Sequence, residues 1–490
     1  MIKSKKLGIF IFRRDCRLYD NIGLNELAKK VDIILPIFIL DSNQIISTKE
    51  NSNYFSSNAV QYICETLKDL NSQLDEYNSK LFLLYGQPWE VIAQLITRLT
   101  KIYQSITIGF NNDFSSYSEK RDHGIRTVCS HLNIKTIESR DDYTLRPIDQ
   151  LVKSDGNAFK QFGAFYSHAT SNLEPTKPSK LPIKIKFVSK TFESKLFSSL
   201  KCNYKLNKLN KFYEQNEELA QNGGRTIALG NLHQIKKFTE YNEKRDILSY
   251  KTTNLSAGLN MGCISNRETY WYIKSKLGLK SQIIKQLYWR DFFLTAFVFI
   301  PKARDFKKMI DPRYDQIPWP ANSKIKTGWK AMMESKSGFL LIDAGMQELR
   351  QTGFLHNRLR MILGVFWTKY LHISILNPKY GSQAGYSKML VDAIGPSQNK
   401  MNHHWILDFD YPGKKFSSRG VPLSGRPMRI DNSMIKRWDP DCIYIKKWLP
   451  HLSNYSNKEL IKWSGSDSHP GPIFDPKLQY AEWVKLCQIA

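Results

Sequence analysis

Residues 337–361 constrain this chain most, because they specify two consecutive helices with a sharp turn between them. Ile342, Met346 and Leu349 are spaced as one apolar face of a helix. Gly353 follows them, and glycine is the residue type that most often ends a helix in a left-handed turn. The pattern therefore predicts an amphipathic helix with a buried apolar face and a defined end.

A second helix is expected to begin at His356 and Asn357, in the stretch HNRLRM (356–361). Its polar first turn contains Arg358 and Arg360, and it continues through the apolar run 362–367. Guanidinium groups at the mouth of a buried helix usually bind a carboxylate, a phosphate or another anion. An ordinary helical hairpin with surface arginines is the alternative.

The first 145 residues alternate between strand-like and helix-like segments. Helical periodicity is clearest over residues 58–77, and the strand-like apolar runs are 7–12, 33–40, 81–85, 106–110 and 134–139. This alternation is typical of a parallel sheet with crossover helices, so residues 1–145 are predicted to form an α/β domain. The glycine fingerprint of ordinary dinucleotide-binding domains is absent after the first strand.

The middle of the chain differs in composition. Residues 170–218 are rich in Lys, Ser, Asn and Pro and have no sustained period, which is typical of a solvated and partly mobile connector. We therefore expect residues 146–220 to join the α/β domain to a second domain. Residues 221–490, where the sequence becomes helical, are predicted to form that domain.

The charge of the chain points to polyanionic partners. The formal net charge is +27 at pH 7, which favours nucleic acid, although a membrane surface or solubility alone would also account for it. The seven cysteines are scattered and include no CxxC pair, so a reducing intracellular compartment that contains DNA, cytoplasm or nucleus, is expected. No run is apolar enough for a membrane span or a signal peptide, so no membrane partner is expected, and we predict a monomer.

No metal site is predicted. The cysteines lack the spacing of zinc or iron–sulfur ligands. His403 and His404 are adjacent, so they would point apart on a helix, and no carboxylate or thiol stands at ligand spacing from them.

Motifs along the whole chain resemble one known family. Residues 337–361 are similar to the core of the photolyase/cryptochrome flavoproteins, and the loop FRRDCRLYDN (residues 12–21) is similar to the signature that opens them. Similar segments are also NGGRTIAL (222–229), TTNLSAGLNMGCIS (252–265), QLYWRDFF (286–293) and WDPDCIYIKKWLPHL (438–452). The resemblance is strongest to cyclobutane pyrimidine dimer photolyases. It implies an α/β antenna domain with a parallel sheet, joined by a long linker to an all-helical FAD-binding catalytic domain.

The loop at residues 12–21 has an alternative interpretation without any family. Its arginines could simply form ion pairs inside the loop with Asp15 and Asp20.

The resemblance implies FAD as cofactor, active in its reduced form, and a second antenna chromophore, a folate or a deazaflavin, in many members. Hydroxyl and backbone N–H groups of residues 252–256 suit a diphosphate at a helix start, and a Ser/Thr-rich cap that serves only its own helix is the alternative. Asp392 is expected to pair with Arg360, and Asn399, or alternatively Gln398, is expected to contact the flavin. The positions that match the family's FAD-binding residues are Tyr241, Thr252, Thr253, Asn254, Leu255, Ser256, Arg290, Asn357, Arg360, Asp392 and Asn399.

The same resemblance implies UV-damaged DNA as substrate. Trp289 and Trp405 are expected to stack on a lesion flipped out of the duplex, because aromatic side chains hold extruded bases in this way. The positions matching DNA-contacting residues are Arg245, Gln286, Trp289, Asn357, Met361 and Trp405, and the positions matching catalytic residues are Trp289, Asn357, Met361, Asn399 and Trp405.

Two positions disagree about the lesion. Gln286 is more usual in (6-4) photolyases and animal-type cryptochromes, whereas many cyclobutane-dimer enzymes have Glu. Asn357 favours the dimer, because a (6-4) enzyme is expected to have a second histidine there for proton transfer. A missing acid–base residue removes a chemical step, so we predict light-driven repair of cyclobutane dimers. The alternatives are (6-4) repair and a non-repairing cryptochrome photoreceptor.

The route by which the flavin would be photoreduced does not match the family. Met332, Ile375 and His403 stand where the family commonly has its three tryptophans. Trp329 and Trp367 lie nearby in the sequence, and core packing is the expected role of each, with another electron route through them or through tyrosines as the alternative.

Overall fold

The structure is a computed structural model, and it describes two compact units that interleave along the sequence. The described residues are 5–45, 56–171, 174–182, 185–192, 197, 199–300, 315–320, 322–374, 376–377 and 430–489. The first unit comprises Met1–Gln215, Gln221–Lys237 and Thr253–Ile300, and the second comprises Asn216–Ala220, Phe238–Thr252 and Pro301–Ala490. The predicted division at residues 145 and 220 stays a prediction.

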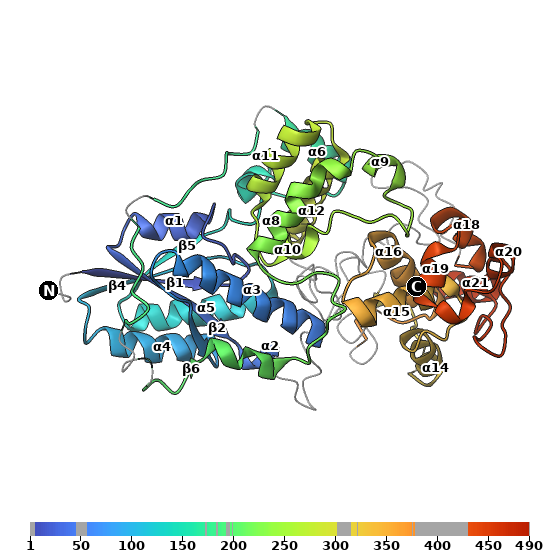
Figure 1. The fold of residues 1–490 in the computed structure, drawn as a ribbon, viewed down its shortest axis with the longest axis horizontal. Helices are drawn as coiled ribbons and strands as arrows, with labels where there is room; N and C mark the ends of the chain where they lie inside the picture. The colour runs from blue at the N-terminus through green and yellow to red at the C-terminus, as the bar shows by residue number, and fades with distance from the viewer. Residues whose placement is uncertain are drawn as a thin grey trace. The chain divides into compact units, whose positions relative to one another are not determined.

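The first unit is built on a six-stranded sheet of order β5-β4-β1-β2-β3-β6 (Figure 1). Its strands are β1 (Lys6–Phe12), β2 (Ile33–Leu40), β3 (Phe82–Tyr85), β4 (Ser105–Asn111), β5 (Lys135–Ser139) and β6 (Asn203–Tyr204). Its longer helices are α1 (Ile22–Ala28), α3 (Ser57–Asp75), α4 (Pro88–Leu99), α5 (Ser116–His131), α6 (Phe162–Thr170), α8 (Arg225–His233), α11 (Asn266–Leu277) and α12 (Gln282–Phe299). Its shorter helices are α2 (Ser42–Ile45), α10 (Ser256–Asn260), η1 (Ile148–Gln150), η2 (Leu206–Phe212) and η3 (Gln234–Lys237).

Strands β1 to β5 pair in parallel, which confirms the predicted α/β class. Leu7 on β1 lies opposite Ile33 of β2 and Ile106 of β4, so apolar runs meet in the centre of the sheet. Right-handed crossovers require α1 and α3 to cover one face and α4 and α5 the other. Figure 1 shows α1 and α4 on opposite sides of the strands. Because helices cover both faces of the sheet, its central strands are buried on both sides and have apolar sequences.

The predicted solvated connector packs against this sheet. Strand β6 extends β3 as an antiparallel edge strand. The Val188 N–H donates to the Ile34 carbonyl over 2.9 Å. Val188, Leu200 and Cys202 are buried. The expectation of a solvated linker is wrong for these residues, because isolated apolar side chains in a polar segment still bury against an open sheet edge.

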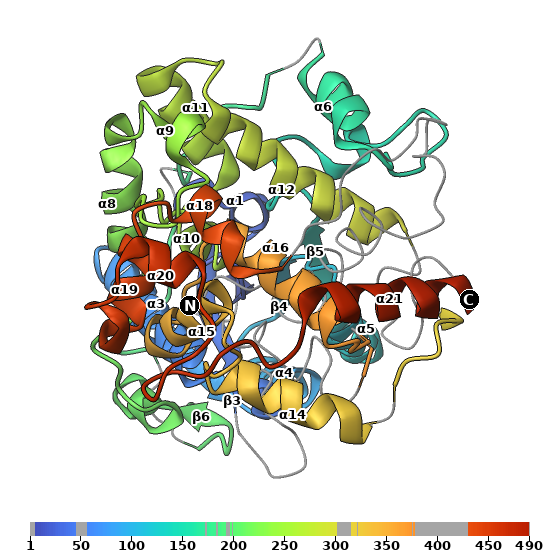
Figure 2. The same cartoon turned by 90° about the vertical axis from the view of Figure 1, so that its right-hand side faces the viewer.

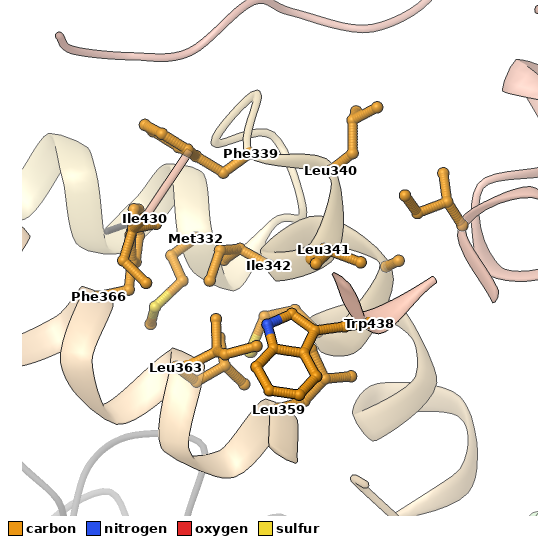
Figure 3. Packing of buried hydrophobic residues seen from close by; sticks show 14 of the residues in the cluster. Met332, Phe339, Leu340, Leu341, Ile342, Leu359, Leu363, Phe366, Ile430 and Trp438 are labelled. Atoms are coloured by element: carbon orange, nitrogen blue, oxygen red, sulfur yellow. The ribbon is translucent and has the colours of Figure 1, made fainter. Parts of the chain in front are cut away.

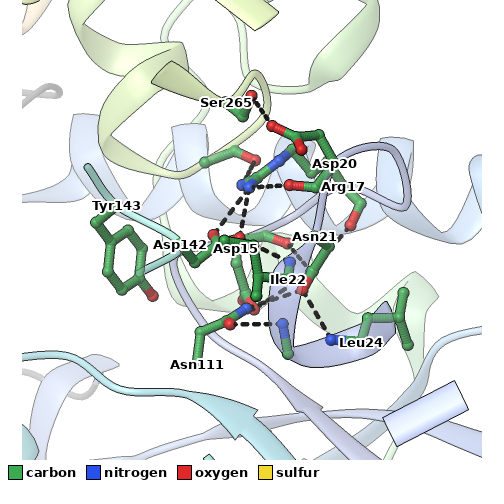
Figure 4. Close-up of polar contacts among 12 residues, drawn as sticks. Asp15, Arg17, Asp20, Asn21, Ile22, Leu24, Asn111, Asp142, Tyr143 and Ser265 are labelled. Atoms are coloured by element: carbon green, nitrogen blue, oxygen red, sulfur yellow. Dashed lines mark hydrogen bonds and ion pairs between the residues drawn. The ribbon is translucent and has the colours of Figure 1, made fainter. Parts of the chain in front are cut away.

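Loop 12–21 follows β1 and is a buried polar junction (Figure 4). Its arginines bind acids far away in sequence: Arg13 with Asp122 at 2.9 Å, Arg14 with Asp113 at 3.2 Å and Arg17 with Asp142 at 2.8 Å. Pairing inside the loop is therefore the wrong interpretation. The carboxyl ends of β1, β4 and β5 meet at one edge of the sheet, which brings the loops that follow these strands together.

The second unit is helical in the part that the structure describes. Its helices are α9 (Tyr241–Lys244), α14 (Asn322–Met333), α15 (Leu340–Thr352), α16 (Asn357–Val365), α18 (Ile435–Trp438), α19 (Ile443–Trp448), α20 (Asn457–Ile461) and α21 (Pro476–Ile489). A π-helix, η5 (Phe366–Tyr370), continues α16, and 3-10 turns occur at η7 (Asn432–Met434) and η8 (Pro450–Leu452). Helix α15 packs against α16 and α19 (Figure 2).

The hairpin of α15 and α16 forms as the sequence predicts. Ile342, Met346 and Leu349 are buried in the hydrophobic core of this unit. Figure 3 shows Ile342 in this core together with Leu359 and Leu363 of α16. Gly353 ends α15 with φ of +66°, and its N–H donates to the Leu349 carbonyl over 2.9 Å. His356 is the N-cap of α16. Apolar periodicity and capping residues together therefore specify this element.

The N-terminus of α15 is anchored by a segment more than a hundred residues away. Asp343 accepts hydrogen bonds from the Ser337 N–H at 2.9 Å, from the Gly338 N–H at 2.8 Å and from His469 Nε2 at 3.0 Å. Gly338 has φ of +74°, and a Cβ there would lie 2.0 Å from the Gly471 carbonyl oxygen. The loop before α15 thus requires glycine and fixes the hairpin to the C-terminal segment.

Among the described helices, none is both long and apolar enough to cross a bilayer.

Candidate functional site

In the first unit, the predicted diphosphate segment leads directly into α10. Asn254 has φ of +51°, Leu255 is buried, and Ser256 is the exposed first residue of the helix. Within the described part of the chain, the side chains of Thr253 and Ser256 make no hydrogen bond. The Asn254 carbonyl accepts from Asn231 Nδ2 over 3.4 Å. Hydroxyl donors are therefore available beside a helix start, which is the environment that a phosphate group needs.

Arg290 on α12 lies against the same segment. Its guanidinium donates to the Leu259 carbonyl of α10 over 3.4 Å and to the Tyr143 carbonyl. The pKa of Arg290 is lowered to about 10, mainly by burial and in part by Arg14 and Arg17, while Asp291 opposes the change. No carboxylate among the described residues forms an ion pair with Arg290. A cation held by carbonyl groups and near other cations is stabilised by a bound anion.

Trp289 precedes Arg290 and stacks on a residue that the sequence did not single out. Its ring and that of Phe162 on α6 are parallel within 5°, with centroids 3.6 Å apart. Phe293, one turn further on α12, stacks at 5.7 Å. Gln286 lies one turn before Trp289 and donates to the Gln282 carbonyl over 3.4 Å. Phe162 therefore covers one face of the tryptophan predicted to grip the lesion, and only tertiary structure reveals this contact.

In the second unit, α9 and α16 bring predicted DNA- and flavin-binding residues together. Arg358 pairs with Asp246 at 2.6 Å, and its guanidinium lies 4.4 Å from the Trp438 ring centroid. Arg358 Nη1 also lies 3.5 Å from the Met361 sulfur. Arg245 lies 3.8 Å from the same Asp246 carboxylate. The first turn of α16 is therefore a basic surface whose arginines are already partly oriented.

His356 at the start of α16 is buried and neutral. Its Nδ1 accepts the Arg358 N–H over 3.1 Å, so the neutral ring carries its proton on Nε2. The pKa of His356 is lowered to about 4, mainly by burial and in part by the charge of Arg360. A histidine with this pKa is a weak proton acceptor at neutral pH. Its visible role is to cap the helix.

For the remaining predicted site residues of this unit, the structure gives one hydrogen bond and the degree of burial. Arg360 Nε donates to the Leu355 carbonyl over 2.8 Å. Asn357 is exposed and Met361 is half-buried. Tyr241 is half-buried, and desolvation raises the pKa of its hydroxyl. Thr252 is also half-buried, at the point where the chain passes into the first unit.

Several predicted positions lie outside the described residues. These are Asp392, Gln398, Asn399, Trp405, Ile375, His403 and His404. Met332 is fully buried, and Trp367 is buried with it in the core of the second unit. Trp329 packs against that core.

No group of three or more His, Cys, Asp or Glu side chains in the described ranges could hold a metal ion. The cysteines that are buried free thiols are Cys16, Cys64, Cys129, Cys202, Cys263 and Cys442.

Comparisons with known proteins agree with this geometry. Residues 9–182 match the family model of DNA photolyase, and residues 283–484 match that of the FAD binding domain of DNA photolyase. A deoxyribodipyrimidine photo-lyase of Synechococcus sp. is 26% identical over 503 residues, covering 98% of this chain and 96% of the relative. Cryptochrome-1 of Erithacus rubecula is 27% identical over 479 residues, covering 93% of this chain and 72% of the relative.

Solved structures give the same result for the fold. An archaeal photolyase from Sulfolobus tokodaii, crystallised with two FAD molecules, has a TM-score of 0.80 and 27% identity, with 99% of this chain and 100% of that chain covered. A cryptochrome from Synechocystis sp. PCC6803 has a TM-score of 0.81 at 19% identity and therefore supports the fold alone.

Two family models, one over residues 9–182 and one over residues 283–484, place the chain among the flavoproteins of the photolyase type. The chain belongs to the photolyase/cryptochrome family, and FAD is its cofactor.

The residues present fit that cofactor. Arg290 forms no ion pair among the described residues, and burial is the main cause of its lowered pKa, which the neighbouring Asp291 only partly offsets. A diphosphate beside Leu259 and the hydroxyls of Thr253 and Ser256 would supply the missing negative charge. The predicted FAD-binding residues are consistent with this and stay predictions one by one.

Proposed function

We propose that this protein repairs UV-damaged DNA by light-driven electron transfer, and that its substrate is the cyclobutane pyrimidine dimer. Bound FAD, when reduced and excited by blue light, supplies the electron that splits the dimer. The chain's own residues bind the cofactor, hold the flipped lesion and exclude water. The deoxyribodipyrimidine photo-lyases of Synechococcus and Alkalihalophilus pseudofirmus, at 26% and 25% identity, support the photolyase assignment.

The state of His356 is the observation that favours the cyclobutane dimer. A (6-4) enzyme needs histidines that exchange a proton with the lesion. Here Asn357 and Met361 occupy the expected contact positions, and the only adjacent histidine has its Nδ1 engaged in the helix cap and a pKa of about 4. An imidazole of this kind is neutral at pH 7 and is a poor proton donor.

The proposed division of labour follows the predicted residues. Arg290, with Thr252–Ser256, would bind the FAD diphosphate, and Asp392 with Arg360 would brace the ring beside Asn399. Trp289 and Trp405 would stack on the flipped bases, at roughly 1–3 kcal/mol per base. Gln286, Asn357 and Met361 would contact the lesion, and Arg245 would contact the phosphate backbone. Because the chain has a net charge of +27, its DNA affinity is expected to fall steeply with salt.

The experiment is blue-light repair by purified, dithionite-reduced protein on two duplexes, one with a cyclobutane thymine dimer and one with a (6-4) product. We expect restoration of the first duplex only. Repair of the second duplex would assign the lesion by Gln286 instead. Repair of neither by flavin-loaded protein would favour a cryptochrome photoreceptor, a class to which several relatives of 26–27% identity belong.

The antenna chromophore remains open between chemical classes. The sequence predicts a folate or a deazaflavin as antenna. The Sulfolobus relative contains two FAD molecules, so a second FAD is the third candidate. Extraction of the chromophores from the purified protein distinguishes the three by absorption and mass.

A further inference from the structure

Loop 12–21 contacts the turn that follows α10 through its backbone. The Cys16 N–H donates to the Met261 carbonyl over 3.1 Å, and Arg17 Nη1 donates to the Gly262 carbonyl over 3.1 Å. Gly262 has φ of +63°, and a Cβ there would lie 2.1 Å from the Arg14 carbonyl oxygen. The approach is therefore closer than any side chain at that position would permit.

Buried charges reinforce this contact on the other side of the loop (Figure 4). Arg17 Nη2 lies 2.8 Å from both oxygens of Asp142. Asp20 accepts from Ser265 Oγ at 2.5 Å and from Arg267 Nε at 3.0 Å. All five side chains are almost fully buried. Removing any one partner would leave a buried charge or polar group uncompensated.

The same network reaches Arg290 through the segment 141–146. Asp142 binds Arg17, and the next residue, Tyr143, gives its carbonyl to Arg290 and to Asn266 Nδ2 at 2.9 Å. The Leu145 N–H donates to Asp291 over 2.9 Å. One side of the segment is thus fixed by loop 12–21, and the other side fixes the two residues at the centre of α12.

We propose that Arg17, Asp20, Asp142, Ser265 and Arg267, here called the junction network, position the diphosphate subsite of FAD. The network holds α10 and its following turn on one side and the Arg290 guanidinium on the other, at a fixed separation. These five are positioning residues, since none of them belongs to the predicted cofactor contacts. The inference rests on the proposed function only through the binding of FAD.

The ligand class makes the idea testable, because riboflavin has the flavin ring and lacks the diphosphate. We compare Asp142→Asn with wild type in two measurements: the rate at which holoprotein releases fluorescent FAD after dilution, and the affinity of apoprotein for FAD and for riboflavin. The matched control is Glu138→Gln, which weakens the more exposed Arg126–Glu138 pair of the same unit, 2.8 Å long.

We expect Asp142→Asn to release FAD roughly tenfold faster, within the usual range of coupling energies, with riboflavin affinity unchanged. Glu138→Gln should behave as wild type. Equal losses of FAD and riboflavin affinity, or unchanged FAD release, would overturn the proposal and leave the network a purely structural junction.

A milder pair of variants covers the case in which Asp142→Asn does not fold. Ser265→Ala removes the hydroxyl that donates to Asp20 and caps α11. Ser265→Thr keeps a hydroxyl that can do both. Faster FAD release in the first and rescue in the second supports positioning, and identical rates in both contradict it. Wild-type protein that binds FAD but repairs neither lesion would refute the proposed function and leave this test unaffected.

Discussion

Loop 12–21 of the first unit and the α15–α16 hairpin of the second are both family motifs, and they are stabilised in different ways. In the loop, Arg17 and Asp142 are 125 residues apart and form a buried ion pair. In the hairpin, Ile342, Met346 and Leu349 bury one face of a single helix. The loop depends on a few partners that cannot be exchanged, whereas the hairpin depends on volume and periodicity. We therefore expect the two to respond differently to substitution.

The largest effect is expected from breaking the buried pair. Arg17→Ala leaves Asp142 buried without its cation, which should lower the free energy of unfolding by roughly 3–5 kcal/mol. Chemical denaturation measures this. Arg126→Ala, at the more exposed pair with Glu138, is the control and should cost at most about 1 kcal/mol. Equal costs for the two variants would contradict the distinction between buried junction and surface pair.

A core truncation in the hairpin tests the other side of the comparison. Leu349→Ala removes a fully buried side chain, and such cavities cost roughly 2–5 kcal/mol, while Leu349→Met should cost less than about 1.5 kcal/mol because volume is nearly conserved. Denaturation curves of both variants decide. If Leu349→Met were as unstable as Leu349→Ala, side-chain volume alone would not stabilise the hairpin core, and the proposed difference from the loop would be contradicted.

Glu348, on α15, adds a pH dependence to the hairpin. Burial raises the pKa of Glu348 to about 7, although Tyr444 donates to its carboxyl over 2.5 Å. The native state therefore retains this proton when the unfolded chain has lost it, so its contribution to stability falls as pH rises from about 4.5 to about 7. The slope is at most roughly 1.4 kcal/mol per pH unit.

Glu348→Gln removes that titration. Melting temperatures at pH 5.5 and pH 8 should therefore show the variant gaining stability relative to wild type at the higher pH. A difference between variant and wild type that does not change with pH would contradict the raised pKa.

The smallest expected effect concerns two glycines. Gly353 ends α15 with φ of +66°, so Gly353→Ala should destabilise the protein by about 1–2 kcal/mol. Gly230 lies within α8 with nothing near the place of a Cβ, so Gly230→Ala should stabilise it by roughly 0.5–1 kcal/mol. Thermal melts give the sign of each effect. A Gly353→Ala variant as stable as wild type would refute the assignment of Gly353 as a required left-handed cap, and a destabilising Gly230→Ala would refute the prediction for α8.

What could be predicted from the sequence depended on how local the determinants are. The stripe of Ile342, Met346 and Leu349 and the stop at Gly353 are local, and the structure has them where expected. Strands β1 to β5 were also predicted, because each overlaps a strand-like run of the sequence, whereas the two-residue strand β6 lies in the segment predicted to be a connector. The partner of Asp343 was not, since His469 is 126 residues away and no periodicity links them.

The candidate site shows the same limit. Arg290 could be placed by resemblance, but its support by the Tyr143 carbonyl could not, because a backbone acceptor leaves no trace in side-chain identity. Phe162 was overlooked for a related reason: an aromatic residue on a short helix looks like core, and only its parallel stack on Trp289 marks it. The prediction of a solvated connector at residues 170–218 was wrong where apolar residues such as Val188 are buried, because the average composition of a segment hides a few apolar side chains.

Light-driven repair is tested by the loss of cyclobutane dimers from a duplex mixed with reduced, FAD-loaded protein, under blue light and in the dark. We expect catalytic repair in the light, none in the dark, and none of the (6-4) product. Flavin-loaded, reduced protein that binds the duplex and leaves the dimer intact under blue light would contradict this expectation.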